Sequence, residues 1–339
     1  MKRNGSEKPR RIKSIGPERF LENRAELHNY LFLLNARDKI REWLKSRGYL
    51  EALLPSLAPE TVPDLNLESF AVEFKSVFIP GQKSTLYLQT SPELLLKRLL
   101  ASGVSAVFYL GPAFRQGELA EKHHPEFTMA EWYRAGFSYL DLMAEMEKML
   151  AGLFGLQKPF LRMTLREAMV QASGIDFLQL QKTSALARAI QSRLKSFDAQ
   201  VMDFCDLLEF AMVQWLDPWL IAKDAVFIYD WPFQLAMQAR LKPGDPRLAE
   251  RFELYLRGLE IANGYTEAVA GSELKQRFRA EIQKRKKTGR KTVPLPEKFL
   301  AGIALGLPPC AGVSLGLERL CMALLGLDNL DRLMAFREI

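Results

Sequence analysis

The clearest alternation of apolar and polar positions lies between residues 108 and 133. The run FYLGPAF (108–114) predicts a buried strand, and PEFTMAEWY (125–133) alternates as a half-buried strand does. Period two places four side chains of the second strand on one face: Phe127, Met129, Glu131 and Tyr133. Opposite a loop that opens with Arg115, this face suits an adenine ring and a cation. A half-buried hairpin with a polar edge explains the same pattern equally well.

A second hairpin is predicted for residues 251–267. A two-residue turn at 257–258 would set Tyr255 opposite Glu260, with Glu253 as a diagonal neighbour of Glu260. Two carboxylates at that spacing repel each other unless a cation lies between them. Magnesium on nucleotide phosphates fits, because it takes one or two carboxylates plus phosphate oxygens. Two solvated glutamates on an edge strand remain the alternative.

A third stretch, GVSLGLERLCMALLG (312–326), runs from small residues into an apolar helix with Arg319 in its first turn. Small residues let a backbone approach a ligand, and a helix start favours anions. Glycine before an apolar helix is also an ordinary arrangement, so this stretch is weak evidence alone.

The remaining pattern predicts an α+β domain built on an antiparallel sheet flanked by helices. Residues 21–49 are expected to be helical up to Gly48. A second helix is expected to start at SPE (91–93), with Ser91 as cap and Glu93 in the first turn, where the helix dipole alone explains a glutamate. Residues 139–220 are predicted to be mostly helical and show no functional motif, and residues 225–232 are predicted to form a strand.

Composition and charge indicate the cellular compartment and the kind of partner to expect. The 339 residues contain no apolar run long enough for a membrane helix, and the N-terminus lacks the apolar core of a secretion signal, so we expect a cytoplasmic protein. Three cysteines without paired spacing favour a reducing compartment. The net charge of +7 suggests an acidic partner, either nucleic acid or protein. Positive charge concentrates in residues 1–15 and 277–291; solvated surface is the simpler reading of each, and a shared docking face is a hypothesis.

In this order, the three stretches resemble motifs 2 and 3 and the intervening strands of class II aminoacyl-tRNA synthetases, lysine subgroup. The matching segments are TSPELLLKRLL (90–100), HHPEFTMAEWY (123–133), EIANGYTE (260–267) and GVSLGLERL (312–320). The resemblance spans about residues 35–339 and is strongest to the stand-alone members, which modify a lysine of elongation factor P.

The resemblance implies a domain organisation. Residues 1–18 would be a basic, disordered segment, and 19–339 a class II catalytic domain with a helical insertion at about 139–220. No anticodon-binding domain is expected, because the residues before the first helix are too few for a five-stranded barrel. The segment around Pro55 resembles motif 1, which builds a dimer interface in the family, so a homodimer is implied.

The resemblance also implies roles at an ATP site. Arg115 would bridge the α-phosphate and the substrate carboxylate, and Arg319 would hold the distal phosphates; these two are the candidate catalytic residues. The other nucleotide contacts implied are Glu118 near the adenine amino group, His123 near the phosphates, Phe127 stacked on adenine, and Glu253 with Glu260 holding magnesium.

For a lysine-type substrate, the resemblance implies a second set of contacts. Glu267 and Tyr133 would bind the side-chain ammonium, Glu93 and Glu131 would lie near the backbone amine, and Asn263 would contact the carboxylate, with Tyr265 and Ser314 also at the pocket. Strict alternation turns Asn263, Tyr265 and Glu267 away from Glu260, and we expect a bulge at 262–264 to correct this.

Three positions depart from the family pattern. Gly117 stands where the family has its adenine-contacting glutamate, with Glu118 one step later. Ser314 replaces a smaller alanine or glycine, which bears on the choice between α- and β-lysine. DWPFQLAMQ (230–238), with Phe233 and Gln234, replaces a segment of small residues.

The expected activity is therefore an ATP-dependent ligase. It would activate lysine or (R)-β-lysine as an adenylate and transfer it to a lysine ε-amine of elongation factor P, with ATP and Mg²⁺ as cofactors. One alternative is a free-standing lysyl-tRNA synthetase-like enzyme. The other is a non-catalytic regulatory paralogue that binds lysine or a nucleotide, although such a protein need not keep all four of Arg115, Glu253, Glu260 and Arg319.

Overall fold

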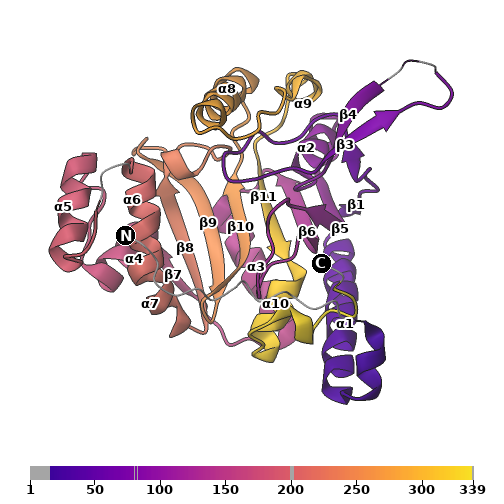
Figure 1. Cartoon of the computed structure of the whole chain (residues 1–339), viewed down its shortest axis with the longest axis horizontal. Coiled ribbons are helices and arrows are strands. Elements are labelled where there is room, and N and C mark those ends of the chain that lie inside the picture. Colours follow the sequence, from indigo (N-terminus) through magenta and orange to yellow (C-terminus); the bar gives the residue numbers. More distant parts are fainter. Residues whose placement is uncertain (1–15, 80, 82, 199–201, 338–339) are drawn as a thin grey trace.

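The computed structural model describes residues 16–79, 81, 83–198 and 202–337. Within this part of the chain, eight strands form one central sheet (Figure 1). In spatial order they are β1 (Leu50–Glu51), β5 (Ala106–Phe114), β6 (Glu126–Ala135), β11 (Cys310–Gly316), β10 (Leu259–Thr266), β9 (Leu248–Leu256), β8 (Ala225–Pro232) and β7 (Leu161–Thr164). Helices flank the sheet, which confirms the predicted α+β class.

The sheet is antiparallel only in its middle. β1 pairs in parallel with β5 at one edge, and β7 pairs in parallel with β8 at the other. β7 lies inside the stretch that was predicted to be mostly helical. Its four residues are too short for an alternation to stand out in the sequence, so only pairing with β8 makes this segment a strand.

The second hairpin forms as predicted. Arg257 and Gly258 both have positive φ angles, 49° and 79°, as a two-residue hairpin turn requires. Tyr255 is paired with Glu260. The predicted bulge exists, but it lies between Glu260 and Ala262 rather than at 262–264. The extra residue places Asn263 opposite Glu253. Because of the bulge, the side chains of Asn263 and Tyr265 lie on the same face of the sheet as Glu260, instead of on the opposite face as strict alternation would place them.

Alternate side chains of β5 and β6 enter two apolar clusters on opposite faces of the sheet. One face is covered by α1 (Arg24–Ser46), α3 (Tyr139–Phe154) and α10 (Leu317–Leu325), which share a cluster with Phe108 and Trp132. On the other face, α2 (Glu93–Ala101), α8 (Gly271–Lys287) and α9 (Glu297–Ile303) pack with Tyr109 and Tyr133. α2 starts at Glu93, with Pro92 rather than Ser91 at the cap position.

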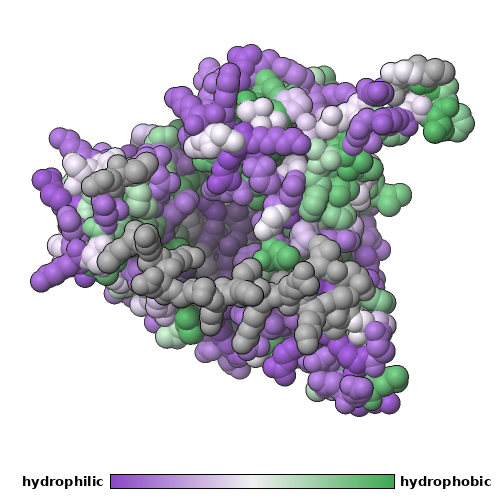
Figure 2. All heavy atoms as spheres, in the orientation of Figure 1, coloured by the Kyte–Doolittle hydropathy of each residue, from purple (hydrophilic) through white to green (hydrophobic). Residues whose placement is uncertain are grey.

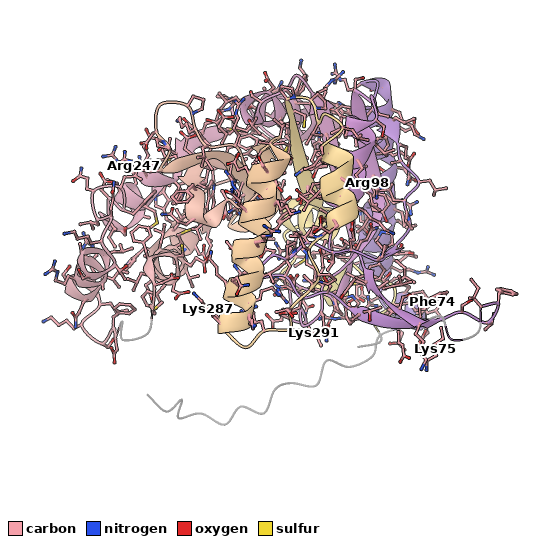
Figure 3. The ribbon with its side chains drawn as sticks, turned by 90° about the horizontal axis from the view of Figure 1, so that it is seen from above. Phe74, Lys75, Arg98, Arg247, Lys287 and Lys291 are labelled. Carbon is pink, nitrogen blue, oxygen red and sulfur yellow. The ribbon has the colours of Figure 1, made fainter. Side chains whose placement is uncertain are left out.

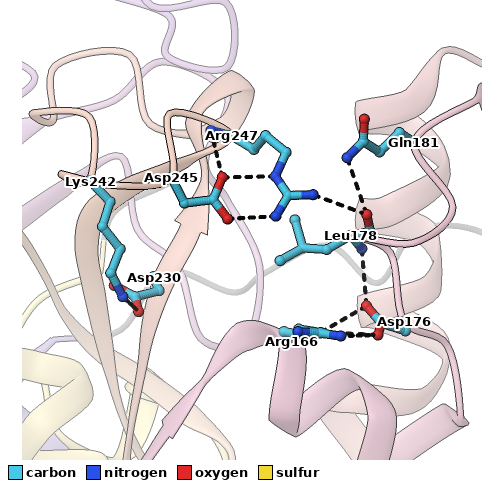
Figure 4. A network of polar contacts seen from close by, with 8 residues as sticks. All are labelled: Arg166, Asp176, Leu178, Gln181, Asp230, Lys242, Asp245 and Arg247. Atoms are coloured by element: carbon cyan, nitrogen blue, oxygen red, sulfur yellow. Dashed lines mark hydrogen bonds and ion pairs between the residues drawn. The ribbon is translucent and has the colours of Figure 1, made fainter.

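The region between β7 and β8 has its own apolar cluster, built on one side of β8. Its helices are α4 (Leu165–Ser173), α5 (Thr183–Arg193), α6 (Phe204–Ala211) and α7 (Asp217–Ile221), with a π-helical turn at Met212–Leu216. Arg247, which is paired with Asp245, also donates to the carbonyl of Leu178, and Arg166 pairs with Asp176 nearby (Figure 4). The hydrogen bond from Arg247 to Leu178 joins the helical region to the connection between β8 and β9.

A smaller sheet contains β2 (Leu57–Ala58), β4 (Lys83–Leu88) and β3 (Ala71–Lys75), and β3 with β4 projects from the body (Figure 1). Short 3₁₀ helices occur at Pro17–Leu21, Phe233–Leu235 and Leu330–Arg332. The first of these begins inside the segment expected to be disordered, whose residues 1–15 lie outside the described part. No helix in the described residues is long and apolar enough to cross a membrane.

Candidate active site

Two adjoining cavities open on the face of the sheet opposite α3 and α10. Figure 2 shows a hollow lined by hydrophilic residues over the middle of the sheet. The first cavity is lined by most of the predicted nucleotide contacts: Arg115, Glu118, His123, Phe127, Glu260 and Arg319. The second is lined by most of the predicted substrate contacts: Glu93, Glu131, Tyr133 and Tyr265. Arg115, Asn263 and Ser314 line both cavities, so they stand at the junction.

Strand β6 runs along both cavities. Its alternation carries Phe127 and Met129 to the first cavity and Glu131 and Tyr133 to the second. Because one strand face supplies all four side chains, the spacing between the two cavities is set by the rise of about 3.3 Å per residue along a strand. The shared face predicted from the sequence is therefore present.

At the first cavity, Arg115 covers the aromatic ring of Phe127. Its guanidinium carbon lies 5.1 Å from the ring centre, and its Nη1 lies 3.6 Å from the Glu118 carboxylate. The Arg115 Nε also donates to the carbonyl of Thr90 over 3.4 Å. A guanidinium on an aromatic face is stabilised by cation–π attraction. This places a permanent positive charge between the two cavities.

Arg319, in the first turn of α10, faces His123 and the start of β10. Its Nη2 lies 2.5 Å from the His123 Nε2, and its Nη1 lies 3.7 Å from the Glu260 carboxylate. Burial, and then the positive charge of Arg319, lower the pKa of His123. His123 is therefore mainly neutral near neutral pH, and the guanidinium supplies the positive charge at this end of the cavity.

Glu253 is not part of either cavity wall. The residue is 5% exposed, and its carboxylate accepts hydrogen bonds from Arg251 and from the Tyr255 hydroxyl. Burial, and then the charge of Glu260, raise its pKa. A cation placed between Glu253 and Glu260 would relieve that repulsion, so the pair fits magnesium on a nucleotide. The described residues contain no cluster of three or more His, Cys, Asp or Glu side chains that could hold a metal ion unaided.

At the second cavity, Glu131 is a buried carboxylate that accepts from one neighbouring side chain. It is 2% exposed and accepts a hydrogen bond of 2.7 Å from the Tyr133 hydroxyl. Burial, and then repulsion from Glu93, raise the pKa of Glu131 to about 8. Asn263 accepts from the Arg251 Nε over 3.0 Å, and the Ser314 hydroxyl donates to the Asn263 carbonyl over 3.3 Å.

Glu267, like Glu253, is a predicted site residue that the structure does not bring to the wall of either cavity. Its side chain has no exposed surface, and its carboxylate lies 2.5 Å from the ammonium of Lys97. Burial raises the pKa of Glu267 to about 8 although the charge of Lys97 opposes this. Burial lowers the pKa of Lys97, but the negative charges of Glu267 and Glu93 raise it by more, so Lys97 is charged. We infer that Glu267 binds Lys97 in the free protein.

The polar residues of the site that were not predicted from the sequence include Lys97, Gln238, Arg251 and Glu318. Lys97 follows Glu93 by four residues on α2, which places the two side chains on one helix face. This spacing could have predicted their ion pair from the sequence. Glu318 is buried and accepts from the amide of Thr128, which fastens α10 to β6. Gln238 belongs to the segment that departs from the family pattern.

The basic segment at the end of α8 contributes to the site indirectly. Arg285 was expected in a solvated charge run, but it is 1% exposed and donates to the carbonyls of Asp64 and Leu67. Those two residues line the second cavity. Lys287 and Lys291, by contrast, are exposed at this end of the helix (Figure 3). The other half of the hypothetical docking face, residues 1–15, lies outside the described part.

The eight-stranded sheet and the paired cavities define a class of protein. The chain belongs to the class II aminoacyl-tRNA synthetases: the family description "tRNA synthetases class II (D, K and N)" matches residues 18–338. Relatives with a narrower name are similar over nearly their whole length. An elongation factor P–(R)-β-lysine ligase of Vibrio cholerae is 38% identical over 300 residues, which cover 88% of this chain and 91% of that protein.

Two further relatives carry the same name. The elongation factor P–(R)-β-lysine ligase of Hamiltonella defensa is 33% identical over 312 residues, 92% of this chain and 95% of that protein. The one of Salmonella typhi is 36% identical over 314 residues, with the same two coverages of 92% and 95%. The similarity therefore extends through both cavities and the helical region.

Proposed function

We propose that this protein is an ATP-dependent ligase that activates lysine or (R)-β-lysine as an adenylate and transfers it to a lysine ε-amine of elongation factor P. The observation that carries the proposal is the position of Arg115 at the junction of the two cavities. A guanidinium there would reach a nucleotide phosphate on one side and a substrate carboxylate on the other. The relatives, which are named elongation factor P–(R)-β-lysine ligases, support the choice of substrate and acceptor.

In the first step, the substrate carboxylate attacks the α-phosphorus of ATP, and pyrophosphate leaves. Arg115 would neutralise the charge that builds up on the α-phosphate, and Arg319 would hold the distal phosphates. Phe127 would stack on the adenine, with Glu118 and His123 beside the nucleotide. Positioning and charge neutralisation suffice for this kind of phosphorus chemistry, so no protein nucleophile is required.

Glu253 and Glu260 would hold magnesium on the nucleotide phosphates. The ion would supply further positive charge to the nucleotide phosphates. Because Glu253 is buried and bonded to Arg251 and Tyr255, it would act from behind the more exposed Glu260, and a bound magnesium ion would favour its ionised form.

In the second step, the acceptor lysine attacks the carbonyl carbon of the adenylate, an amide bond forms, and AMP leaves. The attacking amine must be neutral, and it loses one proton as the amide forms. Arg115 would again stabilise the departing phosphate. The acidic lining of the second cavity favours a diamino substrate, because buried carboxylates left without partners are costly. Within that cavity, Glu93, Glu131, Tyr133 and Tyr265 would form the amine contacts, with Asn263 near the carboxylate.

The same proposal includes an oligomeric state and a cellular compartment. A homodimer would form through the segment around α1 and Pro55, which resembles motif 1. The enzyme would act in the cytoplasm. Sedimentation of the purified protein tests the first of these, because a dimer has twice the chain mass of 38.7 kDa.

The test of the function is pyrophosphate exchange with ATP, magnesium and each of α-lysine, β-lysine and the other amino acids. We expect exchange that depends on a lysine isomer, and an Arg115→Ala protein that lacks it. Transfer is then compared with elongation factor P and with tRNA as acceptors. Folded wild-type protein that exchanges with no amino acid would refute the ligase assignment.

A further inference from the structure

Two parts of the wall of the second cavity come from connections between strands. Residues 62–67, between β2 and β3, contribute Val62, Asp64 and Leu67. Residues 235–238, between β8 and β9, contribute the other part. A connection is not fixed by a ladder of strand pairing, so its backbone carbonyls need partners from elsewhere in the fold.

Helix α8 supplies partners to the first connection. The Arg285 guanidinium, which is buried, donates to the carbonyls of Asp64 and Leu67. It also donates to the Glu68 carboxylate at 2.8 Å, so its charge is balanced next to the same connection. A guanidinium carries five N–H donors in a planar fork, and one side chain can therefore hold several acceptors at once.

The same helix supplies partners to the second connection. The Arg277 guanidinium donates to the carbonyls of Met237 and Ala239, each at 2.8 Å. Gln238 lies between these two residues, and its side-chain amide donates to the Glu93 carboxylate at 2.6 Å. Arg277 therefore fixes the backbone on both sides of a cavity residue.

α8 is itself held on the core. Leu274 and Phe278 are fully buried in the apolar cluster on this face of the sheet. Arg285 follows Leu274 by eleven residues, which places it on the same face of the helix. Arg277 and Arg285 are separated by two helical turns and lie about 12 Å apart along the axis. One anchored helix thus reaches both connections.

We propose that Arg277 and Arg285 are positioning residues through which α8 holds two parts of the substrate cavity in place and so sets the affinity for the amino acid. The inference rests on the proposed function and deepens it. Arg277 acts through the connection that places Gln238 against Glu93. Arg285 acts through the connection that carries Asp64 to the cavity. Among the described residues, neither connection lines the first cavity, so the effect falls on the amino acid more than on the nucleotide.

A solvated basic surface does not account for these two arginines. Their side chains are 19% (Arg277) and 1% (Arg285) exposed. Lys286 and Lys287, which belong to the same basic stretch, are exposed, and Figure 3 shows Lys287 at the end of the helix. A guanidinium withdrawn from water loses hydration and needs hydrogen-bond partners in return. Here those partners include the carbonyls of the two connections.

Kinetics of pyrophosphate exchange provide the first test, with Arg277→Ala and Arg285→Ala. We expect each variant to raise the KM for the lysine isomer about tenfold or more, because a small displacement of positioning groups can cost up to about a hundredfold. The KM for ATP should change much less. Arg279→Ala is the matched control, since Arg279 is exposed on the same helix, and it should behave as wild type.

Amide hydrogen exchange provides a second test that does not depend on activity. Arg285→Ala should speed exchange in residues 62–68 and leave residues 233–239 unchanged, and Arg277→Ala should do the reverse. Exchange within α8 should stay slow in both variants, because Leu274 and Phe278 still hold the helix on the core. Each variant therefore serves as the control for the other.

Several results would overturn the proposal. One is a wild-type KM for the lysine isomer in both variants, and another is an equal rise in the KM values for lysine and ATP. Faster hydrogen exchange throughout α8 and both connections would make the arginines general stabilisers of the helix. If Arg285→Ala does not fold, Arg285→Lys replaces it, because a lysine keeps the charge beside Glu68 but lacks the planar fork. We expect the same selective rise in KM, and a wild-type KM contradicts the role of Arg285.

Hydrogen exchange also separates this inference from the proposed function. If wild-type protein shows no pyrophosphate exchange with any amino acid, the ligase assignment fails, yet the attachment of the two connections to α8 is still measurable. Unchanged hydrogen exchange at residues 62–68 in Arg285→Ala and at residues 233–239 in Arg277→Ala would then refute the attachment itself.

Discussion

The guanidinium of Arg115 lies 5.1 Å from the centre of the Phe127 ring, on the face where the proposed adenine would stack. Arg115 also lines both cavities. In the proposed function, adenine stacking on this face of Phe127 would require Arg115 to turn towards the α-phosphate. The residue proposed to act at the phosphate thus covers the proposed adenine platform in the free protein.

Replacement of Phe127 tests that relationship. We expect Phe127→Ala to raise the KM for ATP roughly tenfold, because an aromatic contact of this kind is worth about 0.5–1.5 kcal/mol beyond its buried area. The KM for the lysine isomer should change much less. Initial rates of pyrophosphate exchange at varied ATP and varied lysine separate the two effects. An equal rise in both KM values would place Phe127 in the general packing of the hairpin.

Arg115 itself is expected to act mainly on kcat. Arg115→Ala should lower kcat about 10²–10³-fold, since removal of one preorganised charge costs about 3–4 kcal/mol of transition-state stabilisation. Arg115→Lys should recover little, because an ammonium lacks the planar fork that contacts two oxygen groups at once. Single-turnover formation of the adenylate measures both variants. A lysine variant with wild-type kcat would contradict the bridging role.

The raised pKa of Glu131, about 8, predicts how affinity depends on pH. Below that value the carboxyl is neutral in the free protein and attracts an ammonium weakly, so the KM for lysine should fall as pH rises from 6 to 8. Glu131→Gln should remove this dependence. The effect of pH on folding stability runs the other way. The folded state holds the Glu131 proton more tightly than the unfolded state does, so the raised pKa stabilises the folded state fully below about pH 4.5. That stabilisation is lost as the pH rises through about 8. Calorimetric titrations with lysine across this range provide the check.

Gly312 on β11 leaves room for Tyr133. A Cβ at this position would lie 2.0 Å from the Tyr133 ring, so Gly312→Ala must displace that ring or the strand. Overpacking of this kind typically costs about 1–3 kcal/mol of stability, and we expect a higher KM for lysine as well. Gly152→Ala is the control, because a Cβ there meets nothing within 4 Å on the exposed side of α3. Urea unfolding and exchange kinetics measure the two variants side by side.

Ser314 is expected to influence the choice between lysine isomers. Its hydroxyl stands at the junction of the cavities and donates to the Asn263 carbonyl. We expect Ser314→Ala to change the ratio of kcat/KM for β-lysine and α-lysine by about 10- to 200-fold, since one small group in a pocket is worth about 1–3 kcal/mol. Exchange assays with both isomers measure the ratio. An unchanged ratio would exclude Ser314 as a specificity determinant.

The short-range pattern of the sequence determined much of the molecule. The alternation of PEFTMAEWY set which side chains of β6 share a face, and the Arg257-Gly258 turn set the pairing of Tyr255 with Glu260. Both follow from local rules, because period two and turn geometry depend on neighbours in the chain. The resemblance of four short segments was enough to assign the family, which the match over residues 18–338 confirms.

Tertiary structure decided what depends on distant residues. β7 becomes a strand only because β8 lies beside it, and the bulge falls at Ile261 because β9 and β10 must keep their pairing on both sides. Arg285 looks like part of a solvated charge run until the loop at Asp64 and Leu67 surrounds it.

The charge of the substrate cavity was the least predictable feature. Glu93 and Glu267 are far apart in the sequence, and each resembles a substrate ligand by its motif. Folding places the Lys97 ammonium between them, so a group that neither motif had singled out becomes their partner. The sequence alone determined that carboxylates gather here; only the tertiary structure decided which are already paired, because a buried charge is compensated by whichever opposite charge the packing brings within contact.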